Sequence, residues 1–168
     1  ENAANACALA ELWSGSFSES VRNLIAVTIS EGVGVGMILN GQLVRGAGGL
    51  AGEFGHVTIQ DNGPMCKCGN KGCLEVCGSN TAALRYYHGL TAGEGSGKSA
   101  PPDFNAILQL AEHGDVRAGE ALNRMAQGLG AGVAMLVTGL SPDVIVLVGE
   151  VTSAWERVGP IITEAVQR

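Results

Sequence analysis

Residues 23–44, NLIAVTISEGVGVGMILNGQLV, decide the fold class that we predict for this chain. The first part, residues 23–30, is apolar and rich in β-branched side chains, which is typical of a buried strand. Further on, two apolar triplets flank Asn40-Gly41, a dipeptide that supplies the two positive φ angles of a type I′ turn. The pattern therefore predicts a strand followed by a β-hairpin.

Helices are predicted on both sides of this hairpin. Residues 4–13 are rich in Ala and Leu and contain neither Gly nor Pro, and Asn2 is a candidate N-cap for that helix. Further helices are predicted over 74–87 with an interruption near Gly78, and over 104–112, 115–140 and 154–168. The long helix has apolar residues at core spacing, namely Leu122, Met125, Leu129, Val133 and Leu136.

A second strand signal, DVIVLVG at residues 143–149, predicts another buried strand. Residues 89–102 are rich in Gly, Ser and Pro and form the one linker-like stretch of the chain. A strand, a hairpin, helices and a further buried strand together predict an α/β layered domain, a mixed sheet with flanking helices.

Composition excludes several classes of protein. The chain has 168 residues, of which 46% are hydrophobic and 15% charged, so a disordered chain and a coiled coil are excluded. A net charge of −6 argues against a broad nucleic-acid-binding face. We find no apolar run that predicts a membrane span and no secretory signal, so a cytoplasmic, bacterial location is expected.

Four potential metal ligands follow the spacing His56-x9-Cys66-x-Cys68-x4-Cys73. Three thiolates and one imidazole suit tetrahedral Zn²⁺ in a closed structural site. Glycines between the last two cysteines allow the sharp turn that brings the sulfur atoms together. The sequence therefore predicts a zinc-binding loop within residues 56–73.

Two alternatives to zinc are free cysteines in a loop and disulfides in a secreted protein. The odd count of five cysteines and the absence of a signal sequence disfavour disulfides. Cys77 lies four residues after Cys73 and is interpreted as a packing residue, and Cys7 as a small buried hydrophobic residue.

Residues 29–56, ISEGVGVGMILNGQLVRGAGGLAGEFGH, together with 66–75, CKCGNKGCLE, resemble the signature of the ROK family of repressors, open reading frames and sugar kinases. The resemblance implies an actin-like, ribonuclease-H-like fold of two lobes with a sugar in the cleft. Residues 1–168 would then be part of the sugar-binding lobe. The first lobe, the final helices and an N-terminal DNA-binding domain would lie outside this chain.

The resemblance also implies a sugar site made of Asn2, Glu53, His56 and Glu75. Carboxylates and amides offer the acceptors and donors that vicinal hydroxyl groups need. A zinc-bound His56 would keep its second ring nitrogen for a sugar hydroxyl, so the metal would brace the site. The alternatives are a capped helix for Asn2, a solvated loop charge for Glu53 and a first-turn acid for Glu75.

The chain departs from the kinase members of the family at three places. Ala3 stands where the kinases have the aspartate that acts as the general base, and Glu150 stands where nucleotide-binding members continue with glycine. A carboxylate at Glu31 would repel a polyphosphate. We therefore predict a degenerate phosphate loop, no catalytic residue and no enzyme activity; the loop residues are Ser30, Glu31, Gly32 and Gly34.

These inferences predict the sugar-sensing effector domain of a transcriptional regulator. A sugar would act as the effector, and DNA would be bound only through the absent helix-turn-helix domain. A homodimer or a higher homo-oligomer is expected from the resemblance. An ATP-dependent sugar kinase of the same family is the alternative. A zinc module for macromolecular contacts is disfavoured because only Lys67 and Lys71 lie nearby, without aromatic residues.

Overall fold

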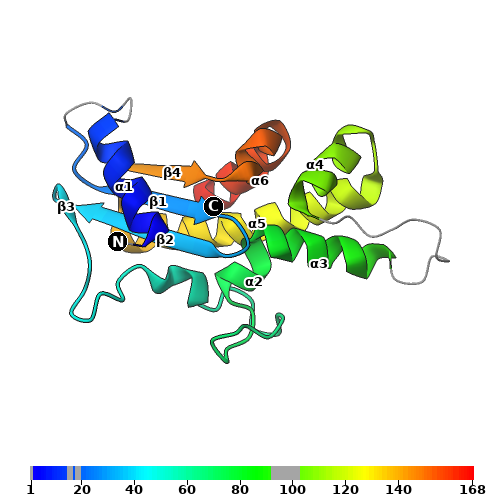
Figure 1. Ribbon diagram of the computed structural model, residues 1–168, viewed down its shortest axis with the longest axis horizontal. Coiled ribbons are helices and arrows are strands. Elements are labelled where there is room, and N and C mark those ends of the chain that lie inside the picture. The colour runs from blue at the N-terminus through cyan, green and yellow to red at the C-terminus, as the bar shows by residue number, and fades with distance from the viewer. Residues whose placement is uncertain (1, 15–16, 18–19, 92–102) are drawn as a thin grey trace.

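The computed structural model describes residues 2–14, 17, 20–91 and 103–168 and is built on a four-stranded mixed sheet (Figure 1). The strand order is β3-β2-β1-β4, with β4 parallel to β1 and the other pairs antiparallel. The strands are β1 (Leu24–Ile29), β2 (Val33–Leu39), β3 (Gln42–Leu43) and β4 (Val144–Val148). The predicted hairpin is confirmed, because Asn40 and Gly41 have φ angles of 54° and 77°.

Helices cover both faces of the sheet, with α1 on one face and α5 on the other (Figure 1). The α-helices are α1 (Ala3–Ser14), α2 (Leu74–Gly78), α3 (Asn80–Thr91), α4 (Phe104–Glu112), α5 (Val116–Leu140) and α6 (Trp155–Gln167), and the 3-10 helices are η1 (Glu53–His56) and η2 (Glu150–Ala154). The predicted interruption after Gly78 is confirmed. Within the predicted linker, α3 extends to Thr91, and residues 92–102 lie outside the described residues. In the described part of the chain, none of the helices could span a bilayer.

Alternation along β1 divides the core between the two faces. Leu24 and Ala26 pack towards α1, whereas Ile25, Val27 and Ile29 belong to the larger cluster that includes α5. The five α5 residues that were predicted from their helical spacing to be core residues are all buried. The prediction that this face of α5 belongs to the core is therefore confirmed.

The glycines of β2 have a packing role that sequence reasoning did not predict. Gly34 was assigned to a phosphate loop, but it lies within β2, opposite Thr28. A Cβ atom on Gly36 would come within 2.2 Å of the backbone oxygen of Ala4, and one on Gly34 within 3.1 Å of the Ala4 side chain. The strand therefore carries glycine on the α1 face because the helix backbone approaches it closely.

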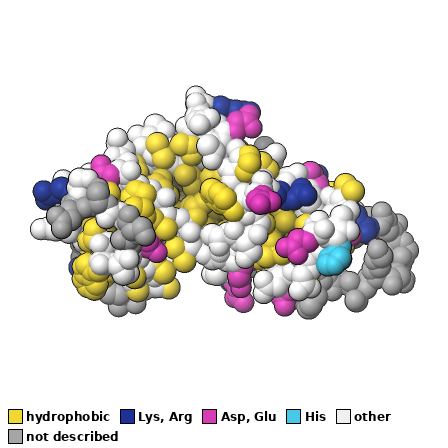
Figure 2. Space-filling model, turned by 90° about the horizontal axis from the view of Figure 1, so that it is seen from above, with side chains coloured by type: hydrophobic (Ala, Val, Ile, Leu, Met, Phe, Trp, Pro, Cys, Tyr) yellow, Lys and Arg dark blue, Asp and Glu magenta, His cyan; other side chains and the backbone are white. Residues whose placement is uncertain are grey.

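Residues 143–149 were predicted to form a buried strand. The strand is present as β4, but the prediction that it is buried is wrong. All five of its residues are half-buried, because β4 forms the edge of the sheet next to β1. Figure 2 looks onto this side of the molecule, where hydrophobic side chains line a hollow in the middle of the face. A continuous apolar run is typical of a central strand, so sequence pattern alone did not distinguish the two positions.

Asp115 caps α5, and its replacement should destabilise the protein. Its carboxylate accepts hydrogen bonds from the backbone amides of Arg117 and Ala118, at 2.9 and 3.1 Å. Burial by itself raises the pKa of Asp115, but the hydrogen bonds from Arg117 and Ala118 outweigh it and hold the pKa below its usual value. We expect Asp115→Ala to lower the free energy of unfolding at neutral pH by about 1 kcal/mol.

Urea denaturation of wild type, Asp115→Ala and Asp115→Asn checks this expectation. Asparagine keeps an oxygen that can cap the helix but removes the charge, so it should cost less than alanine. Because the pKa is lower in the folded state, the charge stabilises the protein above about pH 4 and stops doing so as the pH falls through the folded-state pKa. If the free energy of unfolding of wild type exceeded that of Asp115→Asn by the same amount down to about pH 2, the stabilising role of the Asp115 charge would be contradicted.

Candidate functional site

Two candidate site residues, Glu53 and His56, lie on η1, which rests against the edge of β2. A Cβ atom on Gly52 would lie 2.3 Å from the backbone oxygen of Val35, and one on Gly55 would lie 2.2 Å from that of Val33. Gly52 also has a φ of 98°, which favours glycine. The GEFGH stretch therefore needs its glycines so that this short helix can lie against the strand.

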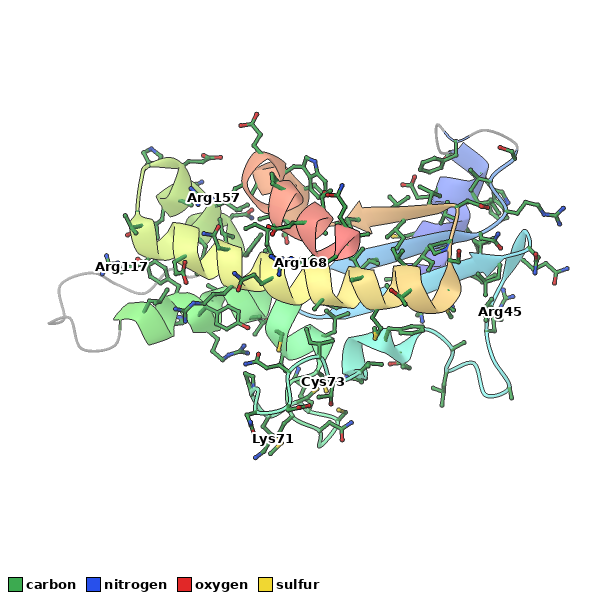
Figure 3. The ribbon with its side chains drawn as sticks, turned by 180° about the vertical axis from the view of Figure 1, so that it is seen from behind. Arg45, Lys71, Cys73, Arg117, Arg157 and Arg168 are labelled. Atoms are coloured by element: carbon green, nitrogen blue, oxygen red, sulfur yellow. The ribbon has the colours of Figure 1, made fainter. Side chains whose placement is uncertain are left out.

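The predicted zinc loop follows η1 and is closed by its own backbone. Thr58 pairs with Cys73 and Met65 with Lys71 in isolated antiparallel bridges. Gly72 has a φ of 61°, and a Cβ atom there would lie 1.8 Å from the backbone oxygen of Gln60. Figure 3 shows the loop projecting away from α5, with Cys73 nearer the body of the molecule and Lys71 further out.

The four predicted metal ligands converge at this loop. One ligand atom from each of His56, Cys66, Cys68 and Cys73 lies within 4.8 Å of the others. The sulfur atoms of Cys68 and Cys73 are 3.6 Å apart, and the Cys66 sulfur lies 3.5 Å from Nδ1 of His56. Zn–S bonds of about 2.3 Å at tetrahedral angles would place two sulfur atoms about 3.8 Å apart. The donor set and its spacing therefore fit Zn²⁺.

The cysteines of the cluster differ in exposure and in pKa. Cys66 and Cys73 are buried, whereas Cys68 is exposed. A hydrogen bond from the Asn70 backbone lowers the pKa of Cys68, whereas burial is the main cause that raises the pKa of Cys73 to about 12. Because zinc binds thiolates, loading of this site must release the proton that Cys73 holds.

His56 belongs to the His/Cys cluster and also lies next to Glu53, another candidate sugar ligand. Its Nδ1 faces Cys66, whereas its Nε2 lies 3.8 Å from Oε2 of Glu53. Both side chains are partly exposed, at 37% for His56 and 56% for Glu53. The imidazole can therefore bind a metal through Nδ1 while Nε2 stays beside a carboxylate on the accessible side.

Glu75 and Asn2, the other two candidate sugar ligands, stand on two different helices. Glu75 is in the first turn of α2, and its carboxylate lies so close to Gly32 that a Cβ atom there would clash with it. A Cβ atom on Gly55 would lie 3.8 Å from Cβ of Glu75, and η1 and α2 are neighbours, so Glu53, His56 and Glu75 come from adjacent elements. Oδ1 of Asn2 accepts a hydrogen bond from the Asn5 amide at 2.8 Å, which confirms the predicted N-cap.

The other loop residues assigned to a phosphate site form the turn between β1 and β2. In that turn, the Ser30 amide donates to the oxygen of Gly32, and the oxygen of Glu31 accepts from the Thr81 hydroxyl. Asn80, which sequence reasoning missed, links this turn to the end of β4. Its backbone amide donates to the backbone oxygen of Ser30, and its side-chain nitrogen donates to the carboxylate of Glu150. Its position directly after the predicted helix interruption was the available signal.

The two cysteines outside the cluster have different surroundings. Cys77 is buried and donates to Oε1 of Gln60, and burial raises its pKa, so the packing role predicted for it is confirmed. Cys7 was expected to be buried, but it is only half-buried, at the margin of the cluster beneath α1. It packs against the buried cluster of Ala8, Leu24, Ala26 and Ile38 without being enclosed by it.

Comparison with known proteins gives a family and several relatives. A model described as the ROK family matches residues 1–168. The glucokinase of Thermotoga maritima is 32% identical over 96% of this chain and 53% of its own length. The xylose repressor of Bacillus subtilis is 36% identical over 88% of this chain and 36% of its own length. The chain thus spans about half, or less, of the length of these relatives.

Solved structures of the same fold include kinases and a regulator. The ROK hexokinase from Thermus thermophilus has a TM-score of 0.84 and 33% identity, covering 99% of this chain and 57% of that one. A ROK family transcriptional regulator, described as a homolog of the E. coli MLC protein, has a TM-score of 0.83 and 28% identity, covering 98% and 42%. The predicted actin-like fold is thereby confirmed.

The prediction that the protein is not an enzyme is corrected by these comparisons. The relatives include proteins named glucokinase and N-acetylmannosamine kinase, and the similar structures include a hexokinase and a glucokinase. Alanine at position 3 and glutamate at position 31 therefore do not exclude kinase activity. The physical reason is that a general base is defined by its distance from the reacting hydroxyl and not by one position of the chain, so an alanine at position 3 does not decide the activity.

Proposed function

This chain belongs to the ROK family, and from that premise we propose that it is the sugar-binding effector lobe of a transcriptional regulator. Its sugar site would consist of Glu53, His56 and Glu75 on adjacent elements, with Asn2 at the start of α1. Zinc would be held by His56 and three cysteines of the loop at 56–73. When bound, the metal would fix the orientation of the imidazole ring rather than take part in a reaction.

The observation that carries this proposal is the position of His56 between two groups. Its Nδ1 faces the cysteine cluster and its Nε2 lies 3.8 Å from Glu53 Oε2, on the partly exposed side of η1. Carboxylate oxygens accept from sugar hydroxyls, and a metal-bound imidazole donates through its other nitrogen. Glu75, which lies next to η1 on α2, adds further acceptors.

One feature of the sequence favours the regulator, and the relatives include proteins of both kinds. Ala3 and Glu31 stand where the resemblance places a general base and a phosphate-binding turn, and Glu31 is exposed there. Relatives named xylose repressor align with 88% of the chain. Sugar kinase is the second candidate, favoured by the 32% identity to a glucokinase. Both functions require the same sugar site.

Sugar binding by the full-length protein tests the shared part of the proposal. Calorimetry with glucose, xylose, N-acetylglucosamine and N-acetylmannosamine should find at least one ligand. Glu53→Gln and Glu75→Gln should each weaken its affinity by about tenfold or more, because a hydrogen bond to a charged group contributes about 1.5–3 kcal/mol. Glu120→Gln on α5 is the matched control, since this glutamate pairs with Arg124 and lies outside the site.

Two further measurements separate the regulator from the kinase. In the regulator, the bound sugar should change the affinity of the full-length protein for duplex DNA at fixed salt concentration. In the kinase, the protein should consume ATP in the presence of that sugar. ATP consumption without any effect of the sugar on DNA binding would replace the first candidate with the second.

A further inference from the structure

One ligand of the metal cluster differs from its neighbours in being open to solvent. Cys68 is exposed, whereas Cys66 and Cys73 are buried beneath the loop. The Cys68 sulfur is also 3.6 Å from that of Cys73, so the solvent-facing thiol has a second thiol as its direct neighbour. An accessible thiol beside a partner thiol is the arrangement that oxidants convert to a disulfide.

The cluster lies close in sequence to the proposed sugar site. Cys73 immediately precedes α2, and its sulfur donates to the backbone oxygen of His56 at 3.3 Å. Glu75 follows two residues later in the first turn of the same helix. A displacement of Cys73 therefore moves the start of α2, and loss of metal removes the group that fixes Nδ1 of His56.

We propose that this cluster is a redox-sensitive switch, in which peroxide joins Cys68 to Cys73 and releases zinc, so that sugar affinity falls. The inference rests on the proposed sugar-binding function and adds regulation to the same site. Its acting residues are Cys68 as the first thiol attacked and Cys73 as the thiol that resolves the intermediate.

The chemistry balances with hydrogen peroxide as the oxidant. The Cys68 sulfur attacks one peroxide oxygen, the O–O bond breaks, and Cys68 becomes a sulfenic acid while one water is released. The Cys73 sulfur then attacks the Cys68 sulfur, the S–S bond forms, and the sulfenic oxygen leaves as a second water. The two sulfurs, which are thiolates while zinc is bound, have lost two electrons and the peroxide has gained them, and solvent supplies the two protons that complete the two waters. Zinc binds thiolates, and the two sulfur atoms of the disulfide are no longer thiolates, so zinc leaves as the hydrated ion.

The test uses the zinc-loaded full-length protein with hydrogen peroxide. A chromogenic chelator records zinc release, peptide mass spectrometry locates the disulfide, and calorimetry measures sugar affinity before oxidation, after it, and after treatment with a thiol reductant and zinc. We expect one zinc released for each Cys68–Cys73 disulfide, a tenfold or greater loss of sugar affinity, and recovery on reduction.

Matched variants separate the cluster from the remaining thiols. Cys7→Ser and Cys77→Ser, which remove the two cysteines outside the cluster, should respond to peroxide as wild type does. Cys68→His keeps four zinc ligands, since imidazole also binds zinc, and should release zinc far more slowly. Mapping of the disulfide in wild type decides the matter even where this variant does not load zinc.

Three results would overturn the switch. The first is that zinc stays bound at a peroxide concentration high enough to oxidise the exposed Met65. The second is a disulfide that joins other cysteines, and the third is a sugar affinity that does not change after zinc release. Failure of the proposed function looks different. The untreated, zinc-loaded protein would then bind no sugar at all, and the regulatory role would fall with it, whatever the zinc and disulfide measurements give.

Discussion

Cys73→Ser is expected to abolish tight zinc binding and with it sugar binding. The hydroxyl of serine is a much poorer zinc ligand than a thiolate, and Cys73 is a buried member of the four-ligand cluster. Loss of an outer-sphere partner alone costs about 10–100-fold in metal affinity, so loss of a direct ligand should cost at least about 100-fold. Metal analysis after dialysis against a chelator should find one zinc per wild-type chain and close to none in the variant.

Loss of zinc should also loosen the elements that depend on the loop. Cys73 pairs with Thr58, and Leu74 donates to the backbone oxygen of Val57, so the start of α2 and the end of η1 are held together there. Sugar affinity should therefore fall by tenfold or more, because His56 and Glu75 lose their relative positions. The midpoint of thermal unfolding should fall by several degrees, since each 1 kcal/mol is worth about 2–4 °C in a chain of this size.

The control for this experiment is Cys77→Ser. Cys77 is equally buried and only four residues away, but it contacts Gln60 rather than the cluster. We expect the control to lose some stability through packing but to keep one zinc per chain. A Cys73→Ser protein that retains zinc against the chelator as well as Cys77→Ser does would show that the cluster is not the zinc site.

Gly36→Ala is expected to destabilise the fold more than any other single-methyl addition to β2. The new Cβ atom would lie 2.2 Å from the oxygen and 2.5 Å from the carbonyl carbon of Ala4, which are backbone atoms of α1. Because neither backbone can rotate away as a side chain can, α1 must move off the sheet. Overpacking of this kind costs about 1–3 kcal/mol, or roughly 2–12 °C in the unfolding midpoint.

The matched control is Gly139→Ala, near the end of α5. A Cβ atom there meets no other atom within 4 Å, and alanine is the better helix former. This substitution should leave stability unchanged or raise it by about 0.5 kcal/mol. Equal unfolding midpoints for the two variants in a thermal scan would contradict the close approach of α1 to β2.

Gly36→Ala has a functional readout as well. Helix α1 carries Asn2 at its start, where the resemblance places a sugar ligand. Displacement of α1 should weaken sugar binding while zinc content stays at one per chain, because none of the four residues of the His/Cys cluster lies on α1. Measurements of stability, sugar affinity and zinc content therefore distinguish Gly36→Ala, which should keep zinc, from Cys73→Ser, which should lose it.

The convergence of the His/Cys cluster was predictable from sequence because its four residues are close together along the chain. His56 and Cys73 are separated by 17 positions, and glycines between them adopt the positive φ angles that the sharp turns of the loop need. Asn40-Gly41 was predictable for the same reason, since a two-residue turn depends on its own dihedral angles. The periodic core of α5 follows from helix geometry alone.

The exposure of each cysteine was not predictable from spacing. Only one residue separates Cys66 from Cys68, yet Cys66 is buried and Cys68 is exposed. The loop that carries them folds back on itself through the bridges of Thr58 with Cys73 and of Met65 with Lys71. The role of Asn80 depends on contact with Ser30 and with Glu150, 70 positions away. No local pattern reports such contacts.

Local sequence patterns were enough to predict the strands, the hairpin, the helices and the four residues of the His/Cys cluster, because short-range geometry governs all of them. Only the tertiary structure decided what the glycines of β2 are for. A glycine that binds phosphate and a glycine that admits a helix backbone look alike in sequence. They are distinguished by what stands opposite the missing Cβ atom, which for Gly36 is Ala4, 32 positions away and on another element.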